Sequence, residues 1–539
     1  MKTFCWEVSC LAVVLLMLVG VGGCRTGKED GKAGSTEVDL GPTIGSLATV
    51  MRSGPVAVEG YGLVGGLAGA GSAYCPPQVR AYLKRYIPTQ LPAERVSVDH
   101  LLNSKDTAVV QLEGEIPALP SKDDQFDVRV ALVSGSQAAS IQGGWLYRAE
   151  LFPKGTFGAG IKPLATVEGP VFIGPLGTVE PDRKSGYILG GGRAGYDSTI
   201  LLRLRRADYR VASTIRNRLS ERYGANVAQA LSPREIEVRI PPKFRQRKSR
   251  FVAMIPATFL TATEELARAR IGTFVERLAA ADDKDDSEVT LEAIGRGSLD
   301  KLAGLLSASD VEVRRRAARC MLNLDDDRGF AVLHALVMDK ESPHRLEACE
   351  AIMVSARRND GLALARRLLR DDDVTVVLAA YEHLRRLEDP AVARERIGRS
   401  FLLEQVVPTN RKAIFVARSG DPRIVLFGAP LTCRDNVFVE SPDQAIVVDA
   451  RAGQEYVSVF RKHPTRPGVL GPIRTGRDLR SLIHALGDEA TRTESGELAG
   501  LGVSYPEVIV LMEQLTTKGA VAAEFWAGPL PKIAPAVKK

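Results

Sequence analysis

The chain has 539 residues, of which 45% are apolar and 25% charged, and its formal net charge at pH 7 is +7. The length predicts about three or four domains, and the composition is that of an ordinary globular protein. The basic residues are spread along the chain, which argues against a nucleic-acid-binding protein. One short basic run, "KFRQRKSR" (residues 243–250), fits either a solvated loop or a contact with an anionic partner such as a phosphate or a cell-wall polymer.

The N-terminus has the pattern of a secretory signal. Lys2 precedes an apolar stretch at residues 11–23, which is shorter than the roughly 20 residues that span a bilayer, and Cys24 follows it. The ending "VGGC" resembles a bacterial lipobox, and Arg25 in place of an aspartate favours the outer membrane. We expect a lipoprotein-type signal peptide over residues 1–23 with lipid attached at Cys24; the alternative is an ordinary signal peptide. The polar, glycine-rich residues 24–39 then form a flexible tether.

Residues 40–261 are predicted to be rich in strands. Apolar and polar residues alternate in "TAVVQLEGEI" (107–116) and in "FDVRVALV" (126–133), and the short link between them predicts antiparallel neighbours. A helix is expected to begin after Asp208, which can cap it, and to end at Gly224. Another strand follows at residues 235–240, which makes this region α+β.

Residues 262–400 change to a helical period and repeat every 31 residues. Equivalent positions are Ala317, Ala348 and Ala379; Leu322, Met353 and Leu384; Leu302, Leu333 and Leu364; and Leu306, Val337 and Leu368. Two helices per repeat predict a HEAT-like solenoid of about three or four stacked units. The acidic run at residues 282–288 is expected in the loop before the best repeats.

Residues 401–539 return to strands. The expected strands are "AIFVA", "RIVLFG" and "AIVVDA", and a helix follows between Pro506 and the stop signal Gly519. The predicted fold class is therefore α+β, with two strand-rich segments separated by an inserted all-α HEAT-like solenoid.

The motifs of common catalytic and metal sites are missing from this sequence. It has no C-x-x-C pair, no G-x-S-x-G, no H-E-x-x-H and no Walker loop, and its six histidines do not pair at metal-ligand spacing. Cys320 and Cys349 fit buried thiols, with a disulfide as the alternative. We expect no catalytic residue, no cofactor, no metal and no enzyme activity.

The stretch "EGYGLVGGLAGAGS" (residues 59–72) contains G-x-G-x-x-G at Gly60, Gly62 and Gly65, a pattern associated with dinucleotide binding. Dinucleotide binding through this pattern needs a helix that begins at the third glycine, but the first plausible helix in this sequence begins near Pro76. The expected purpose of these glycines is therefore structural: they supply a positive φ and let another backbone approach closely.

This stretch resembles the flagellar P-ring protein family, which has a similar glycine-rich segment near its mature N-terminus. The later segments "QGGWLYRAEL" and "YPEVIVLMEQLTTKGAVAAEF" resemble the family in the same order, so the resemblance covers about residues 40–260 and 405–527. The residues that carry the motif are Gly60, Tyr61, Gly62, Leu63, Gly65, Gly143 and Gly144. The inserted helical region and the lipobox depart from the family.

The resemblance implies a structural component of the bacterial flagellar basal body. Such a protein forms the periplasmic P ring around the rod as a bushing, and its partners are further copies of itself, the rod, the outer-membrane L ring and peptidoglycan, with no nucleic acid. The solenoid adds a surface for an extra protein partner. The alternative is a lipid-anchored envelope protein that uses the solenoid as a protein-binding module.

Overall fold

The computed structural model describes most of the chain. The described residues are 39–51, 54–90, 97–158, 160–174, 182–261, 263–462, 468–492 and 498–529. The predicted signal peptide, Cys24 and the tether up to residue 38 lie outside them.

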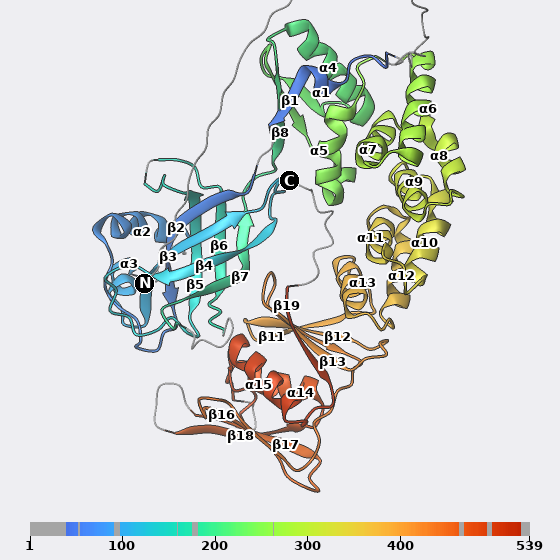
Figure 1. The fold of residues 1–539 in the computed structure, drawn as a ribbon. Coiled ribbons are helices and arrows are strands. Elements are labelled where there is room, and N and C mark those ends of the chain that lie inside the picture. The colour runs from blue at the N-terminus through green and yellow to red at the C-terminus, as the bar shows by residue number, and fades with distance from the viewer. Residues whose placement is uncertain are drawn as a thin grey trace, which may run out of the picture. The chain divides into compact units, whose positions relative to one another are not determined.

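Six strands form a closed barrel in the order β2-β3-β4-β7-β6-β5 (Figure 1). Their bounds are β2 (Val56–Gly65), β3 (Thr107–Ile116), β4 (Gln125–Leu132), β5 (Trp145–Pro153), β6 (Ala165–Pro170) and β7 (Ser185–Ala194). Val110 pairs with Leu132 and Leu112 with Val130, so the expected antiparallel pair is confirmed. The inward residues of these strands fill the barrel, while helices α2 (Pro77–Gln90) and α3 (Val98–Asn103) cover its outside.

A second sheet has the order β1-β8-β10-β9, and helices pack on one of its faces. Its elements are β1 (Ala48–Met51), β8 (Thr199–Leu204), β9 (Ala228–Ala230), β10 (Glu235–Arg239), α1 (Ile44–Leu47), α4 (Tyr209–Tyr223), η1 (Pro242–Arg247) and α5 (Lys248–Ala257). The predicted limits of α4 are confirmed: Asp208 accepts the N–H of Arg210 at 2.7 Å, and Gly224 ends the helix with φ of 121°.

The middle of the chain is a stack of helix pairs (Figure 1). The helices are α6 (Glu264–Ala280), α7 (Asp285–Ile294), η2 (Arg296–Ser298), α8 (Leu299–Leu305), α9 (Val311–Asn323), η3 (Asp327–Gly329), α10 (Phe330–Met338), α11 (Arg345–Ser355), α12 (Arg358–Leu368) and α13 (Val374–Arg386). Helices α7, α9, α11 and α13 are successive neighbours in one layer. The equivalent residues Ala317, Ala348 and Ala379 are buried at 0–2% exposure, because small side chains let these helices pack closely.

The C-terminal region contains a five-stranded sheet in the order β11-β12-β14-β13-β19 and a four-stranded sheet, β15-β16-β17-β18. The bounds are β11 (Ala393–Ile397), β12 (Phe401–Val406), β13 (Ala413–Ala417), β14 (Arg423–Phe427), β15 (Val437–Glu440), β16 (Ile446–Ala450), β17 (Tyr456–Lys462), β18 (Val469–Gly476), α14 (Leu479–Gly487), α15 (Tyr505–Thr517) and β19 (Glu524–Gly528). The predicted strands and the predicted last helix are present, and the predicted fold class is confirmed.

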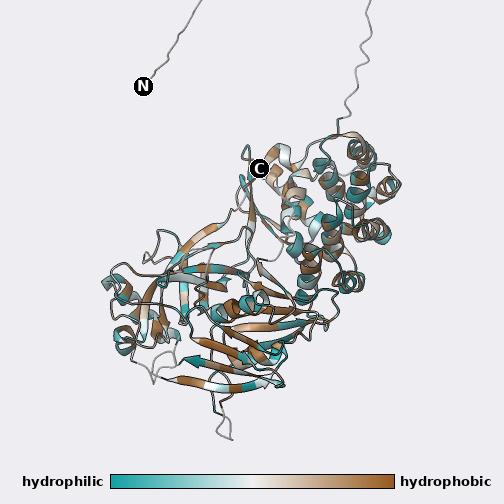
Figure 2. Cartoon of the chain, turned by 60° about the horizontal axis from the view of Figure 1, so that its bottom comes forward, coloured by the Kyte–Doolittle hydropathy of each residue, from teal (hydrophilic) through white to brown (hydrophobic). Residues whose placement is uncertain are grey.

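Hydrophobic cores join the helical stack to its neighbours at both ends. Ala293 of α7 belongs to the core beneath the second sheet. Tyr381 of α13 and Phe427 of β14 share another core, with ring centroids 5.5 Å apart. Figure 2 shows hydrophobic stretches along the strands and along parts of the helices. Cys320 and Cys349 are buried free thiols, and among the described helices none has the length and hydropathy to span a bilayer.

Candidate functional site

The three glycines of the dinucleotide-like pattern lie within a strand. Gly60, Gly62 and Gly65 belong to β2, and none of them has a positive φ. The expectation of a left-handed backbone is wrong for these three residues; it is met only in the turn that follows, at Gly66 (φ 76°) and Gly69 (φ 93°). No helix follows β2 before α2, so the structure lacks the helix N-terminus on which a dinucleotide site depends.

These glycines instead allow β5 to approach β2 closely. A Cβ on Gly60 would lie 2.3 Å from the carbonyl oxygen of Glu150, and one on Gly62 would lie 2.9 Å from Leu146 Cδ1. A Cβ on Gly65 would meet the ring of Tyr147 at 2.7 Å. All three contacts are with β5, whose pairing with β2 closes the barrel and contains a register shift at this place. The close-approach expectation is therefore met.

The side chains between the glycines point out of the barrel. The Tyr61 ring lies 4.7 Å from that of Phe157, centroid to centroid, and Leu63 packs with Val79 and Leu83 of α2. Because successive side chains alternate across a strand, Gly60 and Gly62 take the inward positions. The strand thus buries apolar side chains against the outside of the barrel, while its glycines leave space inside the barrel for atoms of β5.

The second part of the predicted motif reaches the same place. Gly143 and Gly144 form the turn before β5; Gly143 has φ of 72°, and a Cβ on Gly144 would lie 2.5 Å from Val64 Cγ1. The two motif segments are far apart in the sequence, and the structure brings them together at the seam between β2 and β5. Gly60, Gly62, Gly65 and Gly144 meet atoms of the facing segment at this seam.

The basic run at residues 243–250 is not a solvated loop. It forms η1 and the start of α5, and it directs two arginines into the interior. Arg250 Nε donates to Glu292 Oε2 at 2.7 Å, and Arg247 Nη1 lies 3.9 Å from Glu292 Oε1. Lys248 pairs with Asp124 at 2.9 Å. The anionic partners of these three side chains lie in the same chain.

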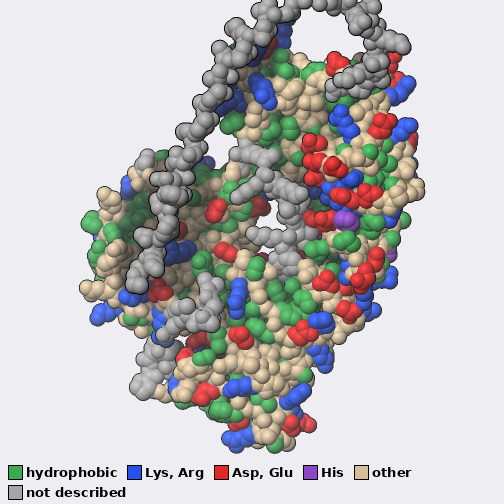
Figure 3. Space-filling view, viewed as in Figure 1, with side chains coloured by type: hydrophobic (Ala, Val, Ile, Leu, Met, Phe, Trp, Pro, Cys, Tyr) green, Lys and Arg blue, Asp and Glu red, His purple; other side chains and the backbone are tan. Residues whose placement is uncertain are grey.

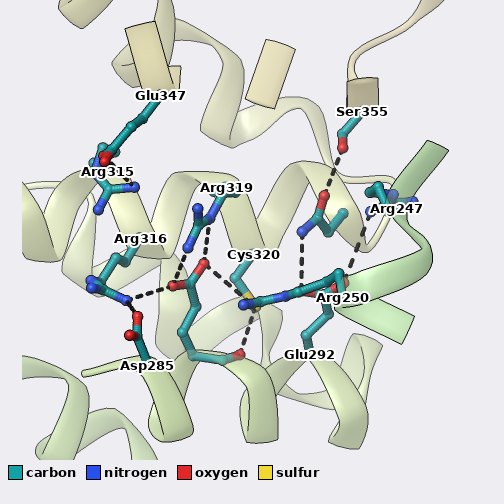
Figure 4. A network of polar contacts seen from close by, with 12 residues as sticks. Arg247, Arg250, Asp285, Glu292, Arg315, Arg316, Arg319, Cys320, Glu347 and Ser355 are labelled. Carbon is teal, nitrogen blue, oxygen red and sulfur yellow. Dashed lines mark hydrogen bonds and ion pairs between the residues drawn. The ribbon is translucent and has the colours of Figure 1, made fainter. Parts of the chain in front are cut away.

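The acidic run contributes to the same cluster: residues 282–284 lie in the expected loop, whereas residues 285–288 belong to a helix. Helix α7 begins at Asp285, and Glu288 on it is fully buried. Figure 4 shows the side chains of Arg250, Arg316 and Arg319 pointing toward one another at this place. The Glu288 carboxylate accepts two hydrogen bonds from Arg319 at 2.6 Å and one from Arg316 at 3.0 Å, and it pairs with Arg250 at 3.2 Å. Glu288 therefore connects α5, α7 and α9.

Electrostatics favour the ionised form of Glu288. Burial by itself would raise the pKa of this carboxyl, but the charges of Arg250, Arg319 and Arg316 outweigh it and lower the pKa to about 2. A buried charge is compatible with a stable fold when it is closely paired and hydrogen-bonded, and removal of one partner strongly lowers the free energy of unfolding.

A second buried carboxylate joins the far end of the helical stack to the C-terminal sheet. Glu404 on β12 has no exposed surface. Its carboxylate accepts one hydrogen bond from the hydroxyl of Tyr381 and another from Nε of Arg385, the latter at 2.9 Å. Arg394 Nε lies 3.6 Å away. We name Glu288, Glu404 and their arginine partners the carboxylate clamps.

Sequence reasoning missed both clamps. For Glu288 a signal existed: Arg319 lies 31 residues further on, one repeat length, so the two charges occupy equivalent positions on adjacent helices. For Glu404 no local pattern distinguishes a buried carboxylate from an exposed one.

Among the described residues, no group of three His, Cys, Asp or Glu side chains could hold a metal ion. A cavity of about 250 Å³ lies between α4 and α7, with Arg222, Tyr223, Phe244 and Glu292 in its wall.

Comparison with known proteins supports the family resemblance that the glycine motif indicated. Residues 43–273 match the family model described as flagellar P-ring protein, and residues 299–385 match HEAT repeats. The flagellar P-ring protein of Hydrogenovibrio crunogenus is 26% identical over 260 residues, which are 44% of this chain and 67% of that protein. That of Desulfotalea psychrophila is 28% identical over 240 residues (40% and 58%), and flagellar P-ring protein 1 of Photobacterium profundum is 30% identical over 240 residues (40% and 60%).

The chain thus spans about three fifths to two thirds of the length of these relatives. The matched residues include the barrel, the glycine seam and the second sheet, and the HEAT repeats follow directly along the chain. The chain is a divergent relative of the flagellar P-ring proteins that carries HEAT repeats between its two strand-rich regions.

Proposed function

We propose that this protein is a structural component of the bacterial flagellar basal body, forming a periplasmic P ring around the rod. The main support for the proposal is that the residues matched by the family model include those that form the glycine seam of the barrel. A ring of this kind is a closed cyclic assembly of identical subunits and requires rigid, repeated interfaces rather than catalysis.

In this proposal the ring acts as a bushing. Its partners are other copies of the chain, the rod, the outer-membrane L ring and peptidoglycan, and the lipid at Cys24 anchors the subunit to the outer membrane. The motif residues at the seam act structurally, by fixing the shape of the barrel. The protein has no cofactor and catalyses no reaction.

Deletion of the gene tests the ring. We expect cells that do not swim, with purified basal bodies that lack the P ring in electron micrographs. Complementation with Gly62→Val is expected to fail, because the added side chain would overlap Leu146, whereas Gly54→Val should restore swimming because Gly54 has open space around it. A deletion strain that swims with intact basal bodies would contradict the proposal.

The HEAT-repeat match supports a second candidate, a lipid-anchored envelope protein that binds a partner through its solenoid. A photoreactive amino acid at Asp300, whose side chain is 97% exposed, would then crosslink an envelope protein that is not a flagellar component. The deletion strain would keep its basal bodies. Crosslinks to flagellar proteins alone would remove this candidate.

A further inference from the structure

Five exposed arginines gather at one end of the second sheet. They come from the end of β8, the loop into α4, the first turn of α4 and the turn between β9 and β10, and they are Arg203, Arg205, Arg206, Arg210 and Arg234. Backbone hydrogen bonds hold the segments together: Leu204 N–H donates to the Arg234 carbonyl at 2.8 Å, and Asp208 N–H to the Pro233 carbonyl at 2.9 Å. Figure 3 shows blue side chains near the top of the view, around β1 and α4. We name these five residues the arginine end.

Most of the charge of the arginine end is available to a partner. Arg203 pairs with Glu235 at 3.2 Å, and Arg205 donates to the carbonyl of Gly45 at 3.2 Å. The other three guanidinium groups make no hydrogen bond or ion pair with a described residue; they belong to Arg206, Arg210 and Arg234. Five arginines against the two carboxylates of Asp208 and Glu235 leave three positive charges in this small area.

Two large apolar side chains stand exposed among these arginines. Tyr209, at the start of α4, is 73% exposed, and Leu231, in the turn between β9 and β10, is 53% exposed. A tyrosine ring with a polar tip suits the boundary between water and lipid headgroups. Basic residues beside such side chains favour an anionic lipid surface over a wall polymer, because both kinds of side chain then gain contacts.

We infer that the arginine end docks on the anionic headgroups of a phospholipid membrane, with Tyr209 and Leu231 entering the headgroup layer. This docking does not depend on ring assembly, so the two can be tested separately.

Vesicle binding by the purified chain tests the inference without ring assembly. Residues 24–539 with Cys24→Ser are mixed with vesicles of 30% phosphatidylglycerol in phosphatidylcholine, with pure phosphatidylcholine vesicles, and with purified peptidoglycan sacculi. We expect sedimentation with the anionic vesicles alone, and weaker binding as salt rises. Each basic residue at an anionic surface strengthens binding about fivefold, so the triple change Arg206→Gln, Arg210→Gln, Arg234→Gln should weaken it about a hundredfold.

The matched control removes the same charge elsewhere. Arg85, Arg183 and Arg434 are exposed arginines far from the arginine end in sequence, and their triple change to Gln should leave most of the binding intact. Equal thermal unfolding of the two triple variants checks that both are folded. In a Tyr209→Trp variant, tryptophan emission should shift to shorter wavelength with anionic vesicles.

Three results would overturn the inference. These are equal binding to neutral vesicles, equal loss in the two triple variants, and sedimentation with sacculi but not with vesicles. The last result would assign the arginine end to an anionic wall polymer. None of them bears on ring formation, which the deletion strain tests separately.

Discussion

Of the three pattern glycines, Gly60 is the one whose added Cβ would come nearest to an atom of β5. The missing Cβ leaves room for the carbonyl oxygen of Glu150, a backbone atom that cannot rotate away. The three glycines of the pattern therefore have a steric purpose, which the dinucleotide-like spacing conceals.

The Gly60→Ala variant is expected to lower the free energy of unfolding by about 1–3 kcal/mol, because forcing a methyl group into a packed site shifts the backbone. Urea unfolding monitored by circular dichroism measures the effect. Gly54→Ala is the control, since Gly54 has no atom near its added Cβ and no positive φ, and its effect should stay within about 0.5 kcal/mol. Equal stability of Gly60→Ala and the parent would show that the seam is loosely packed.

The ionised state of Glu288 makes stability depend on pH. Its pKa is lowered to about 2 in the folded protein, below the ordinary value of 4.5, so its contribution is complete above about pH 4.5 and is lost as the pH falls towards 2. The Glu288→Gln variant removes the carboxylate that pairs with Arg319 and one of the partners of Arg250 and of Arg316, and we expect it to cost about 3–5 kcal/mol at pH 7.

Chemical unfolding of Glu288→Gln and the parent at a series of pH values tests this expectation. The difference between them should shrink as the pH falls below about 4.5. The control is Glu312→Gln, which removes a partly exposed partner of Arg316 and should cost less than about 1 kcal/mol. A difference that stays constant down to pH 2 would contradict the assignment of Glu288 as ionised.

At the scale of elements, α13 has two relations: its sequence continues the 31-residue repeat of the helical stack, and its side chains contact the C-terminal sheet. Tyr381 and Arg385 both direct polar groups to Glu404 on β12. The last repeat therefore ends on a sheet, which replaces the polar cap that a free solenoid needs.

The Glu404→Gln variant should loosen α13 before it unfolds the rest of the chain, because Arg385, which keeps Asp421, loses a buried carboxylate acceptor on β12. Amide hydrogen exchange read by mass spectrometry should be faster in α13 and β12 and unchanged in the barrel. Glu388→Gln changes an exposed carboxylate just beyond the same helix and should leave exchange as it is. Uniform acceleration throughout the chain would argue against a local clamp.

At the scale of the whole molecule, the barrel also bonds directly to the C-terminal region. Asp127 Oδ1 on β4 accepts the N–H of Gly190 at 2.7 Å and that of Gly420 at 3.0 Å. Phe172, which follows β6, and Leu189, within β7, belong to the C-terminal core. The helical stack is thus an insertion between two regions that also contact each other.

The Asp127→Ala variant is expected to separate the thermal unfolding of these regions, since two backbone N–H groups lose their acceptor at the junction. Scanning calorimetry should show a broader or split transition. Glu115→Ala, at an exposed position of the neighbouring strand β3, is the control and should keep the shape of the parent transition. A single sharp transition in both variants would mean that the shared core alone couples the regions.

The amino-acid sequence by itself determined the local features: alternating strands, the caps of α4, the 31-residue repeat and the family motif. Each depends on residues that are neighbours in the chain or one repeat apart, so periodicity and side-chain chemistry reveal them. The tertiary structure alone decided that Gly60 lies against Glu150, that the basic run at residues 243–250 meets Glu292, and that Glu404 is buried. Whether a charge is solvated or paired depends on partners that only the packing of distant segments brings within hydrogen-bonding distance.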